Sequence, residues 1–428
     1  MLENNTKHLG TLHFKFSRDY EYIHSITADD TGDYFVISCT NSLVILKRQG
    51  NEFIPISSIR SPHDGATISC AWSPLYSTKY ALFATCSDDK TVGIWLLNKN
   101  INFRSIKKTE LIDYQSIPKG PCTLTARLRD AKLSVTKCCF AIMDGFNNDE
   151  ATSLNSLSSC LLLFTCSEDG YIRVYIAQDP PTFLLWTIKD QFPCHINNPR
   201  GCLTFSLKQY KPPIIINNNE SIYTYIFNQI VVGGFDGRFK IFAQIKILCD
   251  SSSNNQTGTE ITEDKNMTPT LLSPRTSSPK KIEWKLIYET CNQLSTNESI
   301  LDVSWCPNYC RKYDILATSH DSTSSPWIGI WKWEIIDELS GNLILLQKLF
   351  IDSLNSSICL SWNTSGTELI ASTYCETIRY LLINNKYTRY NHTDDTKSSQ
   401  KSLLTTISNK MNYSSNCLYF VRCITPLS

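Results

Sequence analysis

The chain has 428 residues, of which 42% are hydrophobic and 19% charged, so its composition is that of a folded protein rather than an extended charged one. Forty-one Lys and Arg balance forty Asp and Glu without a basic block, which argues against direct nucleic acid binding. The first residues lack the apolar core of a secretory signal, and the longest apolar runs are too short to span a bilayer. We therefore expect no membrane insertion and a cytosolic or nuclear-facing protein.

Eighteen cysteines raise the question of disulfides or zinc. The sequence has no Cys-x-x-Cys pair, and Cys306 and Cys310 are not followed by a second Cys or His pair at zinc-finger spacing. Cys86 and Cys166 lie inside hydrophobic alternations, where a reduced cysteine packs as a small apolar residue. We predict reduced core cysteines, no metal site and no cofactor.

One pattern recurs six times along the chain. It consists of short alternating apolar runs separated by Ser, Asp and Gly turns, which is typical of antiparallel strands joined by hairpins. The copies lie in 22–48, 63–97, 134–177, 201–243, 300–333 and 358–383, and their first strands end at or near Ala28, Trp72, Phe140, Phe205, Trp305 and Trp362. Most copies are spaced more widely than the about 40–45 residues of a compact propeller blade. The sequence predicts an all-β propeller with six blades.

Polar stretches account for most of the extra length, and added loop length costs little closure entropy. We expect disordered insertions at about 141–159, 207–228 and 249–281. Residues 1–385 are predicted to form the propeller. Residues 386–428 are predicted to be a polar tail, in which 417–424 could supply one more strand.

Three Ser/Thr-Pro dipeptides lie in the insertion at 249–281, at Thr268, Ser273 and Ser278. They are candidate sites for proline-directed phosphorylation, which would add a charge of about −1.5 to −2 at each. Ser-Pro is also common in ordinary loops, so that alternative stays open.

The second copy carries a combination of side chains that could hydrogen-bond across one blade. His63 precedes its first strand, and Asp89 lies in a turn six residues before Trp95. The Asp can fix the tight turn while the indole supplies bulk and one donor. The arrangement resembles the WD-repeat pattern, in which His, Ser or Thr, Asp and Trp form a hydrogen-bonded chain.

The same six-residue spacing joins Asp169 to Tyr175 and Asp236 to Phe242. In the fifth copy Asp321 stands ten residues before Trp331. The first and sixth copies offer only Thr40 and Cys375 near the expected place. We expect the first, fifth and sixth blades to depend on packing instead.

A His and an Asp in proximity also suit acid–base catalysis or metal binding. No nucleophile or third ligand accompanies His63 and Asp89, and the pairing recurs as a blade feature. The sequence also lacks a Gly-x-Gly-x-x-Gly loop, a Walker motif, His-Glu-x-x-His and Gly-x-Ser-x-Gly. We therefore predict no catalytic residues and a protein that is not an enzyme.

Three segments carry a resemblance to a known family. They are SVTKCCF with LLLFTCSEDGYIRVYIAQDP, SWCPNYCRKY with DILATSHD, and SWNTSGTELIAS. In this order they resemble the third, fifth and sixth blades of the Sec-thirteen-homologue nucleoporins, and the likeness covers most of 22–385 at modest identity. The resemblance implies an open six-bladed propeller, completed by a blade that a helical-solenoid nucleoporin inserts.

That resemblance further implies a scaffold subunit of the outer-ring coat of the nuclear pore complex. Such a subunit lies at the nuclear envelope among other pore-coat subunits and supports transport of protein and mRNA. The family also serves in a vacuole- or lysosome-associated complex for nutrient (TOR) signalling. Two alternatives remain open: a COPII vesicle-coat propeller, and a generic WD-repeat adaptor whose ring is closed with a seventh blade by residues 1–20 or 386–428.

Overall fold

The fold comes from a computed structural model that describes part of the chain. The described residues are 23–29, 31–50, 52–74, 79–99, 121–143, 160–179, 182–196, 201–219, 222–249, 283–290, 298–307, 313–322, 325–336, 340–351, 358–363, 365–372, 377–383 and 386–389. Within them every regular element is a β-strand. No helix in these ranges is long and apolar enough to cross a bilayer.

The first three sheets are made of consecutive strands. Blade 1 holds β1 (Ile23–Ala28), β2 (Tyr34–Cys39), β3 (Ser42–Gln49) and β4 (Glu52–Arg60). Blade 2 holds β5 (Thr67–Trp72), β6 (Tyr80–Ser87), β7 (Val92–Asn98) and β8 (Cys122–Leu128). Blade 3 holds β9 (Val135–Met143), β10 (Cys160–Ser167), β11 (Tyr171–Ala177) and β12 (Trp186–Pro193).

The other three sheets follow the same plan. Blade 4 holds β13 (Cys202–Asn219), β14 (Ile222–Gly234), β15 (Phe239–Cys249) and β16 (Glu283–Glu289). Blade 5 holds β17 (Ser299–Trp305), β18 (Asp314–Asp321), β19 (Trp327–Ile335) and β20 (Gly341–Phe350). Blade 6 holds β21 (Cys359–Trp362), β22 (Glu368–Ser372), β23 (Thr377–Ile383) and β24 (Lys386–Arg389).

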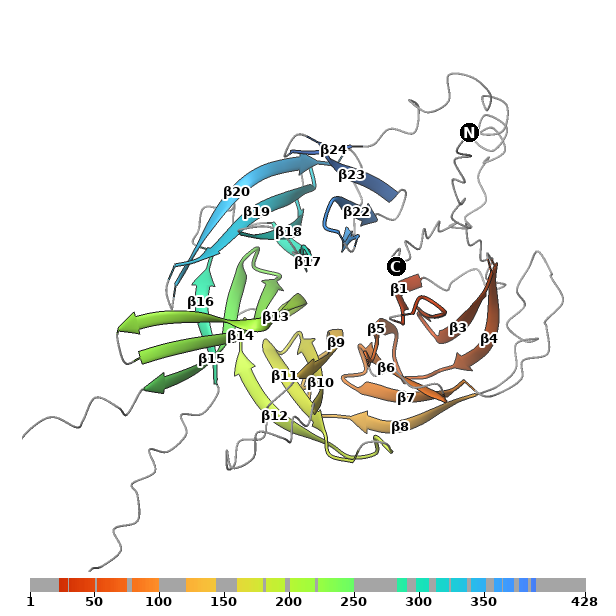
Figure 1. Ribbon diagram of the computed structural model, residues 1–428. Coiled ribbons are helices and arrows are strands. Elements are labelled where there is room, and N and C mark those ends of the chain that lie inside the picture. The colour runs from red at the N-terminus through yellow and green to blue at the C-terminus, as the bar shows by residue number, and fades with distance from the viewer. Residues whose placement is uncertain are drawn as a thin grey trace, which may run out of the picture.

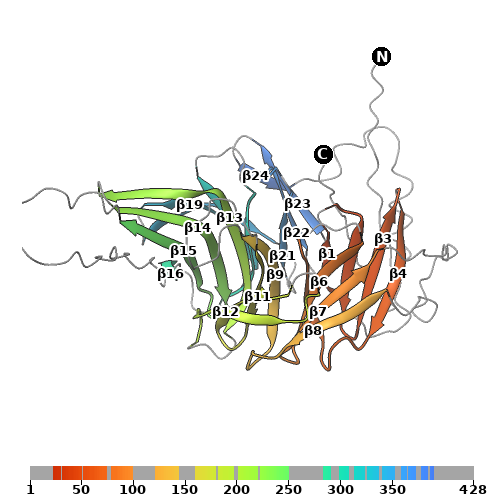
Figure 2. The same cartoon turned by 60° about the horizontal axis from the view of Figure 1, so that its bottom comes forward.

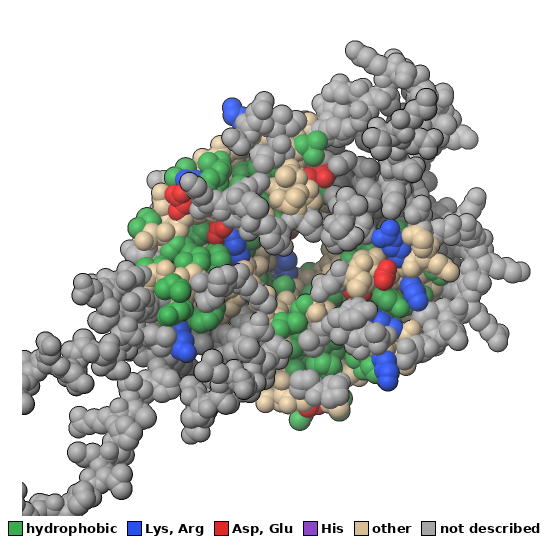
Figure 3. Space-filling model, in the orientation of Figure 1, with side chains coloured by type: hydrophobic (Ala, Val, Ile, Leu, Met, Phe, Trp, Pro, Cys, Tyr) green, Lys and Arg blue, Asp and Glu red, His purple; other side chains and the backbone are tan. Residues whose placement is uncertain are grey.

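The six sheets are arranged round a central axis, with the first strand of each sheet innermost (Figures 1 and 2). All strand pairs are antiparallel and join neighbours in sequence. Consecutive innermost strands contact one another from β1 through β5, β9, β13 and β17 to β21, and an opening remains at the centre of the disc (Figure 3). The prediction of a six-bladed, all-β propeller is confirmed.

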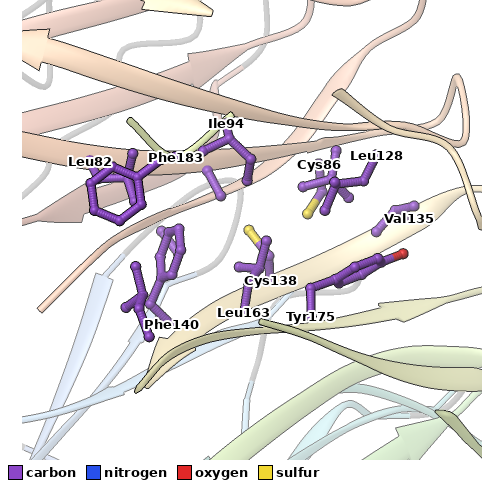
Figure 4. Packing of buried hydrophobic residues seen from close by; sticks show 14 residues of the cluster. Leu82, Cys86, Ile94, Leu128, Val135, Cys138, Phe140, Leu163, Tyr175 and Phe183 are labelled. Atoms are coloured by element: carbon purple, nitrogen blue, oxygen red, sulfur yellow. The ribbon is translucent and has the colours of Figure 1, made fainter. Parts of the chain in front are cut away.

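Buried apolar side chains fill the seams between neighbouring blades. Between blades 2 and 3, for example, Leu82 and Ile94 of one sheet face Phe140 and Leu163 of the next (Figure 4). Equivalent clusters join blades 1 and 2, 3 and 4, 4 and 5, and 5 and 6. Burial of apolar area across these five seams is the main force that holds the disc together.

One expected insertion is ordered, which corrects the sequence prediction. Residues 207–219 and 222–228 extend β13 and β14 into long paired strands rather than forming a disordered loop. Tyr210, Ile214 and Ile216 pack against the cluster between blades 4 and 5, and the strand register is irregular between Gln209 and Ile214. The Lys-Pro-Pro and Asn-rich stretches predicted a loop, but the apolar residues Tyr210, Ile214 and Ile216 among them pack against blade 5.

The remaining boundaries differ less. Residues 141–143 complete β9 and Cys249 completes β15, whereas 144–159 and 250–281 lie outside the described residues. The propeller continues past residue 385, because β24 pairs with β23 as the fourth strand of blade 6. The proposed extra strand at 417–424 lies outside the described residues.

Candidate functional site: the blade networks and the free face of blade 1

In blade 2 the predicted residues form one hydrogen-bonded chain. Trp95 Nε1 donates to Thr85 Oγ1 at 2.9 Å, and Thr85 Oγ1 lies 2.8 Å from His63 Nε2. His63 Nδ1 lies 2.9 Å from Thr91 Oγ1 and 3.3 Å from a carboxylate oxygen of Asp89. Asp89 also accepts from the Thr91 hydroxyl at 2.7 Å. The chain runs from β7 through β6 to the loop before β5.

Burial sets the charge state of this chain. It lowers the pKa of His63, although the nearby Asp89 carboxylate opposes the shift. Burial alone would raise the pKa of Asp89, but hydrogen bonds from Thr91 and the Asp64 backbone N–H outweigh it and lower that pKa. A neutral imidazole therefore bridges Thr85 to an ionised carboxylate. Both ring nitrogens are engaged inside the blade, so these residues act in the fold.

Blade 5 contains a similar chain that the sequence prediction missed. Trp331 Nε1 donates to Thr318 Oγ1 at 2.7 Å, and Thr318 Oγ1 lies 2.7 Å from His320 Nε2. The imidazole comes from β18 itself rather than from the preceding loop, and it stacks on Trp327 with ring centroids 3.8 Å apart. Desolvation lowers the pKa of His320 to about 3, so the ring is neutral. Blade 5 therefore does not depend on packing alone, contrary to expectation.

A glycine makes room for the indole in both blades. A Cβ at Gly93 would lie 2.8 Å from Trp95 Nε1, and a Cβ at Gly329 would lie 2.5 Å from Trp331 Nε1. Each glycine stands two residues before its tryptophan. The Gly-Ile-Trp sequence shared by the two blades thus follows from the close approach of the indole to the threonine.

Blade 3 replaces this chain with an ion pair. Tyr175 has no indole N–H, and Arg173 takes the position that glycine has in blades 2 and 5. The Arg173 guanidinium donates to Asp169 at 2.7 Å and to Ser167 Oγ at 2.8 Å. Burial opposes ionisation of Asp169, but the Arg173 and Ser167 hydrogen bonds lower its pKa. Asp169 also fixes the loop before β9 by accepting from the Lys132 N–H at 2.9 Å.

Blade 4 keeps only the His–Asp contact. His195 Nδ1 lies 3.2 Å from Asp236, whose pKa is lowered by that hydrogen bond against the effect of burial. Phe242 carries no donor, and it packs in the seam with blade 3. The networks of blades 2 to 5 therefore share an anchor, which is a turn in some blades and a threonine in others, while the link to the aromatic differs from blade to blade.

A second polar network joins the innermost strands, and the sequence analysis did not single it out. Asp302 on β17 accepts from Lys137 of β9 at 2.7 Å, from Thr204 of β13 at 2.7 Å and from the Leu360 N–H of β21 at 2.9 Å. Desolvation disfavours the Lys137 charge, but Asp302 outweighs it and raises the pKa of the ammonium. One carboxylate therefore connects four blades around the axis. Its signal in the sequence is a charged residue inside an otherwise apolar inner strand.

The aromatic that ends each network also fills the seam with the preceding blade. Trp95, Tyr175, Phe242 and Trp331 belong to the clusters between blades 1 and 2, 2 and 3, 3 and 4, and 4 and 5, and Tyr380 has the same place between blades 5 and 6. In blade 1 the equivalent strand position holds Leu46, which pairs with Phe35 as Trp331 pairs with Leu316. This geometry defines the side of each blade that faces its predecessor.

Blade 1 has no described predecessor. Phe35, Ile37, Val44 and Leu46 form a buried cluster with other residues of β1–β4 only. These side chains are at most 2% exposed, although no other sheet of the described chain contributes to the cluster. We call this surface the free face of blade 1 in the sense that no other described sheet packs on it, although its side chains are shielded from solvent.

Two further predictions concern sites. Thr268, Ser273 and Ser278 lie outside the described residues, so their phosphorylation stays a prediction. In the ranges that the structure describes, no group of three or more His, Cys, Asp or Glu is arranged to hold a metal ion. Cys86 and Cys166 are buried as expected, and desolvation raises the pKa of both thiols.

One segment of the propeller matches a known repeat family. The family model "WD domain, G-beta repeat" matches residues 55–95, which run from the outer strand of blade 1 through β7 and include His63, Asp89 and Trp95. Nucleoporin SEH1-B of Xenopus laevis is 19% identical over 326 residues, covering 69% of this chain and 77% of the relative. The crystal structure of Saccharomyces cerevisiae Sqt1 is 12% identical with a TM-score of 0.46, covering 86% of this chain and 72% of that one. The chain is a WD-repeat propeller that is similar to a nucleoporin.

Proposed function

We propose that the chain is a non-enzymatic scaffold subunit of the outer-ring coat of the nuclear pore complex. In this role it supports transport of protein and mRNA at the nuclear envelope, alongside other pore-coat subunits. The similarity to a WD-repeat nucleoporin supports the class of assembly. A propeller offers faces and edges for protein partners and needs no catalytic centre to do so.

The observation that carries the proposal is the free face of blade 1. Five seams are filled by two sheets each, whereas Phe35, Ile37, Val44 and Leu46 pack with no second described sheet. A helical-solenoid nucleoporin that inserts a strand-bearing blade would bury its own apolar side chains on this face and complete the ring. Strand addition of this kind satisfies backbone groups as well as apolar area.

The test is affinity purification of the tagged chain from its own cells with mass spectrometry, combined with imaging. We expect a solenoid nucleoporin in the eluate and a signal at the nuclear rim. A vesicle-coat solenoid would identify a COPII propeller instead, and a vacuole- or lysosome-associated set would point to nutrient signalling. Recovery of ubiquitin-ligase subunits without any coat protein would contradict the proposal and favour a generic adaptor.

Two variants, one buried at the free face and one exposed at the rim, help to locate the contact. Leu46→Asp introduces a charge on the free face, and Leu286→Asp introduces one on the outer rim of blade 4. We expect the first to lose the solenoid partner and the second to retain it. Because Leu46 is buried, circular dichroism and a second variant, Val44→Thr, are needed to separate loss of contact from loss of folding. Equal retention by both Leu46→Asp and Leu286→Asp in folded protein would show that the partner binds elsewhere.

A further inference from the structure

The outermost strand of blade 5 has an unusually apolar exposed surface. Four apolar side chains of β20 are exposed, namely Ile344 (42%), Leu345 (43%), Leu346 (49%) and Phe350 (58%). The strand pairs with β19 on one edge, and no strand lies on its other edge in the described chain. An edge of this kind, with unpaired backbone groups beside apolar side chains, is a template for strand pairing.

Four of the other outer strands carry features that discourage such pairing, whereas β8 has no proline and a single charge, Arg127. β4 contains Pro55, β12 contains Lys189 and Asp190, and β16 contains Glu283, Lys285 and Glu289. The four-residue β24 is protected differently, since the Gln347 amide bonds both the N–H (2.9 Å) and the C=O (2.8 Å) of Tyr387. In contrast, β20 has ten residues, no proline and a single charge at Lys348. It lacks the proline, the several charges or the short length that protect those strands, and the β-bulge at Leu346 is its one protective feature.

The β-bulge in each outer strand gives an independent comparison. In blades 1 to 5 the outer strand has one extra residue that has no partner in the register of the third strand. It follows the residue that pairs with the repeat aromatic, or with Leu46 in blade 1. In β4 this residue is Ile56, which is 2% exposed, and in β16 it is Ile287, which is 6% exposed. Both isoleucines lie within a seam between blades. The corresponding Leu346 of β20 is half exposed. A leucine at this position therefore contributes little to the blade that carries it.

We infer that β20 pairs with β20 of a second copy of this chain, antiparallel and about a two-fold axis near Leu345. Such a pairing places Ile344 of one copy opposite Leu346 of the other, so the centre of the contact is apolar. Lys348 of each copy then lies opposite Asn342, and no two like charges meet. A two-fold contact uses the same patch on both subunits, which this strand can supply. The product is a continuous sheet that joins two discs rim to rim.

The test is sedimentation velocity of the full chain over a range of concentrations. We expect a dimer whose fraction rises with concentration and a Leu345→Lys variant that is monomeric throughout. Leu286→Lys is the matched control, because Leu286 has the same strand position in blade 4 and the same exposure, 44% against 43%. This control should dimerise like the unmodified chain. A monomer at every concentration, or equal dissociation by both variants, would overturn the inference.

Asn342→Glu tests the antiparallel register. It places a carboxylate opposite Lys348 of the other copy, and we expect dimerisation to tighten by about two- to fivefold. Adding Lys348→Glu to the same chain should reverse the gain, because two carboxylates would then meet. No change in either variant would contradict the two-fold arrangement. All of these residues lie away from the free face of blade 1, so binding of a solenoid partner can be measured independently of dimerisation.

Discussion

Blades 1 and 5 have the same four-stranded plan but are held in different ways. Blade 5 lies between two apolar seams and has the Trp331–Thr318–His320 chain inside it. Blade 1 has one seam, with blade 2, and Leu46 in place of the tryptophan. A blade in mid-ring is thus fixed by its neighbours and by its own polar chain, whereas the first blade has one face on which no other described sheet packs.

Removing the aromatic of blade 5 should have the largest effect. Trp331→Ala empties part of the seam with blade 4 and leaves Thr318 without its donor. We expect the free energy of unfolding to fall by about 3–5 kcal/mol in denaturant titrations. Trp331→Phe keeps most of the packing and should cost less. If Trp331→Ala costs no more than Leu286→Ala at the rim, the seam does not stabilise the disc as described.

The equivalent change in blade 1 should be smaller and should depend on the partner. Leu46→Ala is expected to cost about 2 kcal/mol in the chain alone, at the low end for a buried leucine, because only one sheet packs around it. With the solenoid partner bound, the cost should rise toward that of a mid-ring residue. The measurement is the unfolding midpoint with and without partner. An identical cost in both conditions would place the partner away from this face.

The close approach of the indole can be tested with one methyl group. Gly329→Ala places a Cβ about 2.5 Å from Trp331 Nε1 and should destabilise the chain by about 1–3 kcal/mol through overpacking. Blade 1 has Val44 at the same position and no indole, so Val44→Ala should instead behave as an ordinary loss of apolar volume. A stabilising Gly329→Ala, measured in the same titration, would mean that the tryptophan is free to move.

Acid should weaken blade 5 through its buried imidazole. The pKa of His320 is about 3 in the folded chain against 6.5 for an unperturbed histidine, so the unfolded chain binds the proton first as pH falls. Stability is therefore present above pH 6.5 and is lost progressively below it, by about 1 kcal/mol between pH 7 and pH 5.5. Unfolding titrations of the chain and of His320→Gln at both pH values should show a larger loss of stability in the chain, because His63, whose pKa is also lowered, contributes to both proteins. Equal pH dependence in the two proteins would contradict a buried neutral ring.

The sequence predicts the inner part of each blade well, for physical reasons. Trp72, Trp305 and Trp362 end the strands on which they were placed. The second strands, such as β6 and β18, are buried along nearly their whole length and leave a nearly continuous apolar signal. The fourth strands were not recognised. Their β-bulges shift the alternation by one residue, so a period of two does not persist along them.

The polar networks were predicted only where they keep the usual spacing. The six-residue spacing between an acid and the aromatic identifies Asp89 in blade 2, but no such spacing leads to His320. Blade 5 supplies its imidazole from a strand position that holds serine in blade 2. The Asp302 network joins residues from four blades and has no local spacing at all. Contacts of that kind depend on the ring itself and become visible only when the inner strands are brought together.

The central claim is that the free face of blade 1 receives a blade from a partner protein. A high-resolution structure of the full chain purified with its solenoid nucleoporin tests it most directly. The account predicts partner strands packed on Phe35, Ile37, Val44 and Leu46, between blade 6 and blade 1. A complex in which the chain's own residues cover this face, with the partner bound to another surface, would contradict it.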